Sequence, residues 1–343
     1  MQPGTPRIYS WEDVRPHVTV IVTAYNREEF LNRALESLIS QDAALGEFEV
    51  IVVKNFDNPE VDRTIRRMGA RSLYDNSAHP YAFSEEAVKS AKGDVICFLD
   101  DDDLFLPQKI SSVTDAFTKN PEVDYYHNSM DYINVNGDAI NPPYSFSFSV
   151  LKKHSRETVL SHEEAGKRIH ELIANKWDYN KSCISVRKKL LIDHLELARE
   201  TVSAYDSLIF YLAALCGRSV MATPKILTHY RLNRKSVTMS SRYKFSVRQV
   251  KTFSALHDFA EAAGEKEIAG VLTRQIFFFE LISSINNPDH SRCVVITASL
   301  SFIRHSRGYS LMANMFPVVL AAVYILSPGL SREMFTKLVM ARL

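Results

Sequence analysis

The apolar run at residues 95–99 leads directly into four consecutive carboxylates, Asp100, Asp101, Asp102 and Asp103. Carboxylates that lie side by side repel one another, so each is protonated more readily unless a cation compensates the charge. Their hard oxygen atoms suit Mg²⁺ or Mn²⁺, which can bridge them to the oxygens of a diphosphate and neutralise charge on a departing nucleoside diphosphate. The alternative interpretation is a solvated acidic turn that also caps the helix expected from residue 107.

The elements that position this acidic tetrad alternate between strand and helix. Residues 18–23, 49–53 and 95–99 are runs of mostly β-branched and apolar residues, typical of strands buried on both faces. After the first run, Asn26 precedes Glu29 by three residues, which predicts that Asn26 caps a helix. That helix has one apolar stripe at helical spacing, made by Phe30, Leu31, Ala34, Leu35, Leu38 and Ile39.

Strands that alternate with helices predict right-handed crossovers and a largely parallel sheet. In open α/β sheets, ligands bind beyond the carboxyl ends of the strands, which is where the tetrad falls. The sequence further predicts helices at 107–118, 161–175, 188–197 and 206–216, a strand around Tyr125, and a turn at 136–137. Because the pattern is nearly all helical from Tyr243, we expect an α/β domain at residues 1–240 and a helical region at 241–343.

Composition excludes several classes of protein. Of the 343 residues, 46% are hydrophobic and 24% charged, which is typical of a globular chain. The formal net charge of +1 lacks the basic excess of nucleic-acid binders, so no nucleic-acid partner is expected. The four cysteines are scattered, which favours reduced thiols over a disulfide framework. Residues 1–15 contain no apolar segment of signal-peptide type, so we expect the protein in the cytoplasm.

Two segments carry a resemblance to a known family, VTVIVTAYN at residues 18–26 and GDVICFLDDDD at residues 93–103. The chain resembles the family-2 glycosyltransferases of the GT-A fold over about residues 16–235. The resemblance implies an enzyme with a Rossmann-like, mostly parallel sheet that uses Mg²⁺ or Mn²⁺. It implies that the Asp-x-Asp pair, Asp100 and Asp102, holds the metal, and that the nucleotide sugar is bound by residues Thr23, Ala24, Tyr25, Asn26, Asn55, Asp100 and Asp101.

The resemblance also implies a general base, the Asp of a Glu-Asp pair that opens a helix. The matching residue here is Asp206, with Tyr205 in place of the usual Glu. Direct displacement at an anomeric carbon needs a carboxylate on the face opposite the leaving group, so the assignment is chemically reasonable. The alternative role for Asp206 is to cap its helix.

Four further positions bear on the donor. Residues 229–235 resemble the family's Tyr-Arg-x-His segment near the diphosphate, and Arg231 and Arg234 are expected to offer forked donors to phosphate oxygens. Asn233 stands where that segment often has His, and Asn55 stands where the family often has an Asp that reads the base. Since an amide both donates and accepts hydrogen bonds, the base stays open between uracil, guanine and thymine, corresponding to UDP-, GDP- or dTDP-linked donors.

The C-terminal region carries a separate prediction. Residues 308–331 contain no charged residue, and residues 316–326 are strongly apolar but too few for a clean membrane span. An interfacial helix flanked by basic residues fits this pattern and predicts peripheral contact with the cytosolic face of the cell membrane, where a lipid-linked glycan would be the acceptor. A buried bundle helix or a homodimer interface is the equally open alternative.

Together these observations predict a metal-dependent inverting glycosyltransferase that moves a sugar from a nucleotide-sugar donor to a hydroxyl acceptor on a glycan or lipid-linked molecule. A nucleotidyltransferase is the first alternative, although residues 23–26 lack the glycine of a phosphate loop. The second alternative is a non-catalytic nucleotide-sugar-binding protein on the same fold.

Overall fold

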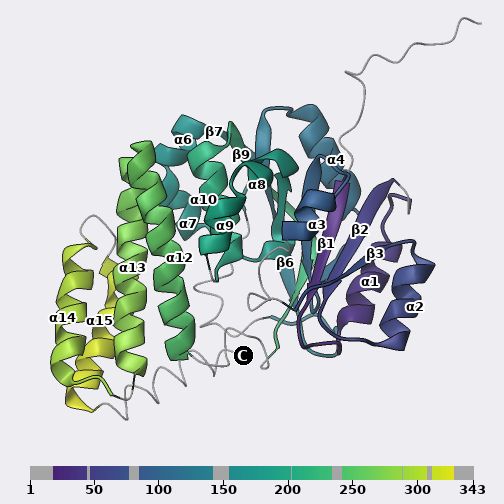
Figure 1. Ribbon diagram of the computed structural model, residues 1–343. Helices are drawn as coiled ribbons and strands as arrows, with labels where there is room; N and C mark the ends of the chain where they lie inside the picture. The colour runs from purple at the N-terminus through teal and green to yellow at the C-terminus, as the bar shows by residue number, and fades with distance from the viewer. Residues whose placement is uncertain are drawn as a thin grey trace, which may run out of the picture.

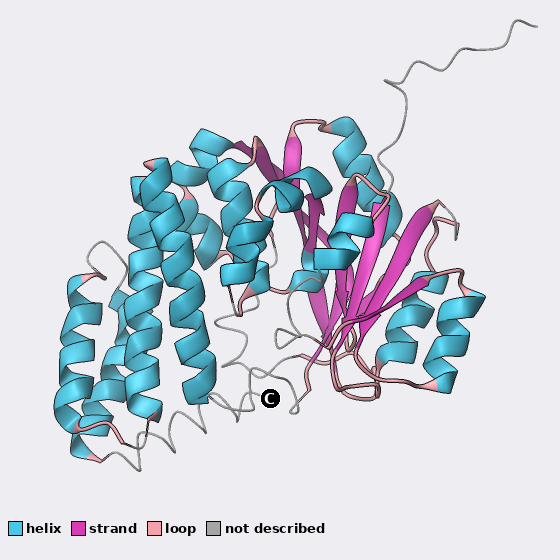
Figure 2. Ribbon diagram, viewed as in Figure 1, coloured by secondary structure: helices cyan, strands magenta, loops and turns pink. Residues whose placement is uncertain are grey.

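The computed structural model describes residues 18–44, 47–76, 85–141, 154–201, 203–233, 242–287, 289–306 and 311–327. Within these ranges, a sheet of nine strands lies between layers of helices, and a group of long helices follows it (Figures 1 and 2). The strand order is β3-β2-β1-β4-β8-β6-β9-β5, with β7 paired to β9. The fold is therefore the mixed α/β architecture that the sequence predicts.

The first half of the sheet is parallel. Neighbouring strands here are β3 (Arg71–Tyr74), β2 (Phe48–Lys54), β1 (Val18–Ala24) and β4 (Val95–Asp100). The connecting helices are α1 (Leu31–Ile39), α2 (Pro59–Arg67) and α3 (Glu85–Ser90). Because these strands run in the same direction, their carboxyl ends meet at one edge of the sheet, the lower edge in Figure 1.

The second half mixes strand directions. Its strands are β5 (Leu104–Phe105), β6 (Val123–Ile133), β7 (Thr158–Ser161), β8 (Ile184–Arg187) and β9 (Ser219–Arg231). Strand β8 runs antiparallel to both β4 and β6, whereas β6 and β9 are parallel. The helices of this half are α4 (Lys109–Lys119), α6 (His162–Lys167), α7 (Ile169–Ala174), α8 (Lys188–Asp193), α9 (Leu195–Glu200) and α10 (Tyr205–Cys216), and a 3₁₀ turn, η2, spans Lys181–Cys183.

The two faces of the sheet build two hydrophobic clusters, because successive side chains of a strand point to opposite faces. Along β1, Val20 and Val22 belong to the cluster under α1, α2 and α4, whereas Ile21 belongs to the cluster under α3, α8 and α10. Helix α10 is buried almost throughout. This burial fixes the start of α10 relative to the sheet, and Asp206 stands in that first turn.

The long helices are α12 (Arg242–Ala263), α13 (Lys266–Asn286), α14 (Arg292–Arg304) and α15 (Leu311–Leu326), drawn in green to yellow in Figure 1. Helix α13 is long and apolar enough to cross a membrane, but half of its most apolar stretch is buried within the protein. Its first half joins the cluster of α10 and α12, and its second half packs against α14 and α15. A core helix has these same properties, so the composition of α13 does not indicate a span.

Some predicted details are wrong. The predicted helices at 161–175 and 188–197 are each split in two, at Arg168 and His194. Asn26 does not cap α1, which follows Phe30 and has no side-chain cap. Asn26 instead adopts a left-handed conformation, with φ of 52°. Its side-chain oxygen accepts a hydrogen bond from the side chain of Asn55, the residue that follows β2.

Candidate functional site

The acidic tetrad lies at the carboxyl-end edge of the sheet. Asp100 ends β4 beside Thr23 of β1, and the hydroxyl of Thr23 donates to the carboxylate of Asp100 at 3.4 Å. The next three residues form the turn to β5, which the Asp103 amide closes by donating to the carbonyl of Asp100. Asp101, Asp102 and Asp103 are all buried, and Asp100 is partly exposed. The tetrad is thus a built feature of the fold and not a solvated loop.

Two basic side chains that the sequence reasoning missed contact these carboxylates. Arg27, in the loop after β1, donates through Nε to Asp101 at 2.7 Å and through Nη2 to the other oxygen of Asp101, and its Nη1 forms an ion pair with Asp102 at 2.8 Å. Lys181, buried in η2, lies 3.0 Å from Asp100 and donates to the hydroxyl of Thr23 at 2.9 Å. Arg27 directly follows the Tyr25–Asn26 motif, which could have drawn attention to it; nothing in the sequence singles out Lys181.

These two cations do not fully compensate the tetrad. Burial and the carboxylates of Asp103 and Asp101 raise the pKa of Asp102 well above its ordinary value. Burial and Asp100 raise the pKa of Asp103 to about 7. Burial also raises the pKa of Asp101, although Arg27 opposes the shift. Negative charge at this edge is therefore unfavourable unless a further cation binds.

The donor set suits a divalent ion. Among the described residues, the four carboxylates form ion pairs with only two basic side chains, Arg27 and Lys181. Asp100 and Asp102 are separated by one residue. No three His, Cys, Asp or Glu side chains of the described residues form a ready-made cage. Magnesium commonly uses one or two carboxylates and completes its coordination with water and phosphate oxygens, so the residues present fit such an ion.

Asp206 occupies the second position of α10. The residue that precedes this helix is Ala204, with φ of 54°, and therefore Asp206 is not the N-cap residue. One carboxylate oxygen accepts from the amide of Asn180 at 3.2 Å, and the other accepts from the amide of Ser207 at 3.0 Å. Burial, Asp178 and Asp100 raise the pKa of Asp206 to about 6. Such a carboxylate is ionised at neutral pH and well matched to accept a proton.

One short turn joins Asp206 to the tetrad. Asn180 has a φ of 63°. Its backbone N–H donates to the carboxylate of Asp206, and its side-chain oxygen accepts from the backbone N–H of Ser182. The hydroxyl of Ser182 accepts from the amide of Asp100 at 3.0 Å, and Lys181 between them contacts the carboxylate of Asp100. The residues from 180 to 182 therefore fix the start of α10 next to the end of β4, although the two lie far apart in the sequence.

The predicted base-reading residues lie at the ends of β1 and β2. The amide of Asn26 donates to the side-chain oxygen of Asn55 at 2.8 Å, and the side-chain nitrogen of Asn55 donates to Asn26 at 2.9 Å. Ala24 is buried and Tyr25 partly exposed. The structure thus brings Thr23, Ala24, Tyr25, Asn26 and Asn55 to the same edge as the tetrad, and their contacts to a nucleotide stay predictions.

The predicted phosphate contact of Arg231 stays a prediction, and the structure shows which other groups this residue contacts. This side chain is 1% exposed and donates to the carbonyls of Asp102, Asn134 and Val135 at 2.8–3.1 Å. Its guanidinium lies over the ring of Phe30, and its backbone amide donates to the carboxylate of Asp103. Arg231 therefore stabilises the acidic turn from behind through Nε and Nη1, whereas its buried Nη2 has no hydrogen-bond partner among the described residues. Arg234 lies outside the described residues.

Comparison with known proteins agrees with this fold. Residues 19–191 match the family model of glycosyl transferase family 2. The poly(ribitol-phosphate) beta-N-acetylglucosaminyltransferase TarS of Staphylococcus aureus is 26% identical over 279 residues, which cover 76% of this chain and 44% of TarS. Protein CgeD of Bacillus subtilis is 27% identical over 179 residues, which cover 47% of this chain and 42% of CgeD. The chain spans less than half the length of these two curated relatives.

Solved structures share the architecture. The crystal structure of S. aureus TarS 1–349 in complex with UDP-GlcNAc superposes with a TM-score of 0.61 at 20% identity, covering 84% of this chain and 81% of that one. The mannosyltransferase PcManGT from Pyrobaculum calidifontis in complex with GDP-Man and Mn²⁺ gives a TM-score of 0.53 at 16% identity, covering 96% and 85%. The fold is that of the GT-A glycosyltransferases, and with half of its residues matched by the family model the chain belongs to glycosyl transferase family 2.

Proposed function

We propose that this protein transfers a sugar from a nucleotide-sugar donor to a hydroxyl acceptor, with Asp206 as the general base. The observation that carries the proposal is the connection through Asn180 and Ser182, which holds a carboxylate of pKa about 6 at the same edge as the acidic tetrad. A base and an anion-handling site at one edge are the two components that displacement at an anomeric carbon needs.

The donor is a nucleotide sugar. Support comes from family membership and from two proteins of the same fold, one in complex with UDP-GlcNAc and one with GDP-Man and Mn²⁺. The Asn26–Asn55 pair lies where the resemblance predicts the base, and its amides can both donate and accept. UDP-, GDP- and dTDP-linked donors are all compatible with this chemistry.

Asp100 and Asp102 are the proposed ligands of Mg²⁺ or Mn²⁺. When bound, the ion would neutralise charge on the diphosphate as the bond to the sugar breaks. Asp206 would take the proton of the acceptor hydroxyl while that oxygen attacks the anomeric carbon from the face opposite the diphosphate. The new bond joins the acceptor oxygen to the anomeric carbon, the bond from that carbon to the phosphate oxygen breaks, and Asp206 then releases its proton to water. Attack from that face inverts the anomeric configuration.

Thermal unfolding in the presence of nucleotide sugars tests the proposal. A ligand that binds only the folded state, and whose free concentration is 100 times its Kd, raises the free energy of unfolding by about 2.7 kcal/mol. We expect one of UDP-, GDP- or dTDP-linked sugars to raise the unfolding temperature, with a larger rise when Mn²⁺ is present. A chain that none of these ligands stabilises, with or without Mn²⁺, would contradict the proposed function.

The acceptor is proposed to be a glycan or lipid-linked molecule met at the cytosolic face of the membrane. Support comes from α14, which buries Val295, Ser299 and Phe302 but exposes an adjacent apolar stripe formed by Ile296, Leu300 and Ile303. Exposed arginines stand at both ends of the helix, Arg292 and Arg304. The sequence has no acidic residue between Asp289 and Glu333. An apolar stripe with only basic flanks suits an anionic lipid surface.

Replacing both Leu300 and Ile303 with Ser is expected to weaken binding to vesicles of phosphatidylglycerol and phosphatidylcholine by about a hundredfold or more, since each fully buried side chain contributes about 1.5–3 kcal/mol. Sedimentation with vesicles measures the effect. Val159→Ser, which changes an exposed apolar residue on β7, is the matched control and should bind as the wild type does. If the wild-type chain ignores vesicles but the double variant converts a dimer to a monomer, the stripe is a homodimer interface instead.

A further inference from the structure

Arg27 is the link between the loop after β1 and the acidic turn after β4. Its side chain is 21% exposed, whereas those of Asp101 and Asp102 are 5% and 12% exposed. Three of its nitrogens contact carboxylate oxygens, two on Asp101 and one on Asp102. One guanidinium therefore compensates two neighbouring carboxylates, and one of these is a proposed metal ligand.

The two halves of this contact differ in strength. Asp101 receives the forked, two-bond arrangement, the strongest geometry that arginine offers a carboxylate. Asp102 has a single ion-pair contact among the described residues, with Nη1 of Arg27 at 2.8 Å. A single contact made by a partly exposed guanidinium contributes little, roughly 1 kcal/mol or less. The contact to Asp102 is therefore the one that a divalent cation displaces most easily.

We propose that Arg27 is an exchangeable counterion of the cation site. It pairs with Asp102 while the divalent cation is absent, and yields Asp102 to the cation while its fork stays on Asp101. This inference rests on the proposed function, because it assumes that Asp102 is a metal ligand.

The exchange couples the binding of the cation to the binding of the nucleotide. An arginine that has given up Asp102 keeps its positive charge beside the bound cation, and the two repel each other. An anionic diphosphate that arrives at this edge relieves that repulsion, so each ligand should strengthen the binding of the other by the same factor. Arg27 would therefore make the cation bind weakly alone and tightly together with a nucleotide.

Binding of Mn²⁺ alone to the full chain, followed by electron paramagnetic resonance of the free ion, tests the exchange. Arg27→Gln is expected to bind Mn²⁺ about fivefold more tightly than the wild type, since removal of a competing contact of about 1 kcal/mol corresponds to that factor. Arg27→Lys should fall between the two, because lysine is a point charge without a fork. In the presence of UDP or GDP, the Mn²⁺ affinity should rise more in the wild type than in Arg27→Gln.

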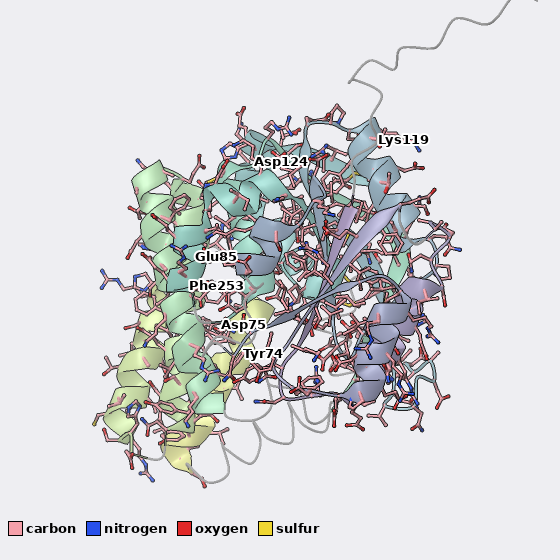
Figure 3. The ribbon with its side chains drawn as sticks, turned by 45° about the vertical axis from the view of Figure 1, so that its right-hand side comes forward. Tyr74, Asp75, Glu85, Lys119, Asp124 and Phe253 are labelled. Atoms are coloured by element: carbon pink, nitrogen blue, oxygen red, sulfur yellow. The ribbon has the colours of Figure 1, made fainter. Side chains whose placement is uncertain are left out.

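Arg218→Gln is the matched control. Arg218 makes a forked contact to Asp124, through Nη2 at 2.7 Å and Nε at 3.2 Å, and precedes β9 at the end opposite Arg231. Figure 3 shows Asp124 at the edge of the sheet opposite Tyr74, the last residue of β3, and Asp75, which follows it. This variant also loses an arginine–aspartate pair, but its Mn²⁺ affinity should equal that of the wild type.

Two results overturn the exchange. One is a folded Arg27→Gln or Arg27→Lys chain that binds Mn²⁺ no more tightly than the wild type; the other is a wild-type chain that binds no Mn²⁺ with or without nucleotide. Both leave the proposed sugar transfer standing if nucleotide sugars still stabilise the chain, although the second also removes the proposed metal site. Loss of that stabilisation in the wild type is the separate result that removes the function itself.

Discussion

Asp206→Asn is expected to lower kcat by about 10²–10⁴-fold, the range that a positioned base supplies, while the affinity for the nucleotide sugar stays unchanged. The amide keeps the size of the side chain, and its oxygen can still accept from the backbone of Asn180 or Ser207. It cannot accept the proton of the acceptor hydroxyl. Steady-state transfer rates together with donor affinity from thermal shift separate the loss of chemistry from a loss of binding.

The pH dependence gives the same prediction a second readout. The pKa of Asp206 is raised to about 6, so at lower pH its carboxyl is protonated and cannot act as a base. The wild-type rate should therefore rise with pH through that value. Asp178→Asn is the matched control, because the charge of Asp178 helps to raise the pKa of Asp206. Its removal should move the rise in rate to lower pH without abolishing transfer. Wild-type turnover by Asp206→Asn would show that the base is another group.

The wild type and Asp206→Asn together separate the alternative functions. A non-catalytic binding protein would be stabilised by a nucleotide sugar but would transfer nothing, even as the wild type. A nucleotidyltransferase would release or consume inorganic diphosphate, and it would not transfer the sugar to a hydroxyl acceptor. Only the glycosyltransferase predicts both donor binding that survives Asp206→Asn and sugar transfer that does not.

The parallel half of the sheet could be predicted because its signal is local. A β-branched run such as residues 18–23 is buried on both faces and has few other stable arrangements. The position of the tetrad followed from the same pattern, since the carboxyl ends of parallel strands meet at one edge. Asp206 came from the family resemblance alone, because nothing in its local sequence indicates that α10 begins next to β4.

The contacts that control the charge of the tetrad could not be predicted. Arg27 lies 74 residues from Asp101, and Lys181 is more than 80 residues from Asp100 in a turn without a recognisable motif. Arg231 shows a related difficulty, because an arginine close to a family motif looks the same in sequence whether its guanidinium faces a ligand or backbone carbonyls. Here the last residue of β9 lies behind the acidic turn, and tertiary packing therefore determined its role.

Asp102→Asn should remove the stabilisation by Mn²⁺ and nucleotide without lowering the stability of the ligand-free protein. Burial and neighbouring carboxylates raise the pKa of Asp102, so its ionised form is unfavourable in the folded state and an uncharged amide relieves that strain. Loss of a direct ligand should weaken Mn²⁺-dependent donor binding by at least the roughly 10–100-fold that supporting residues of metal sites contribute.

Asp115→Asn is the control for this variant, since Asp115 is exposed on α4 and pairs there with Lys119. Figure 3 shows Lys119 far from Tyr74 and Asp75, which mark the site edge. It should unfold as the wild type does, with and without ligands. A residue kept only for stability would show the reverse of the Asp102 pattern, a lower unfolding temperature without ligand and an intact response to it. If Asp102→Asn keeps its response to Mn²⁺ and nucleotide, the tetrad is a structural turn and the proposed metal site is wrong. A lost response without lost stability instead means that the fold tolerates an unfavourable carboxylate at this edge because the ligand requires it.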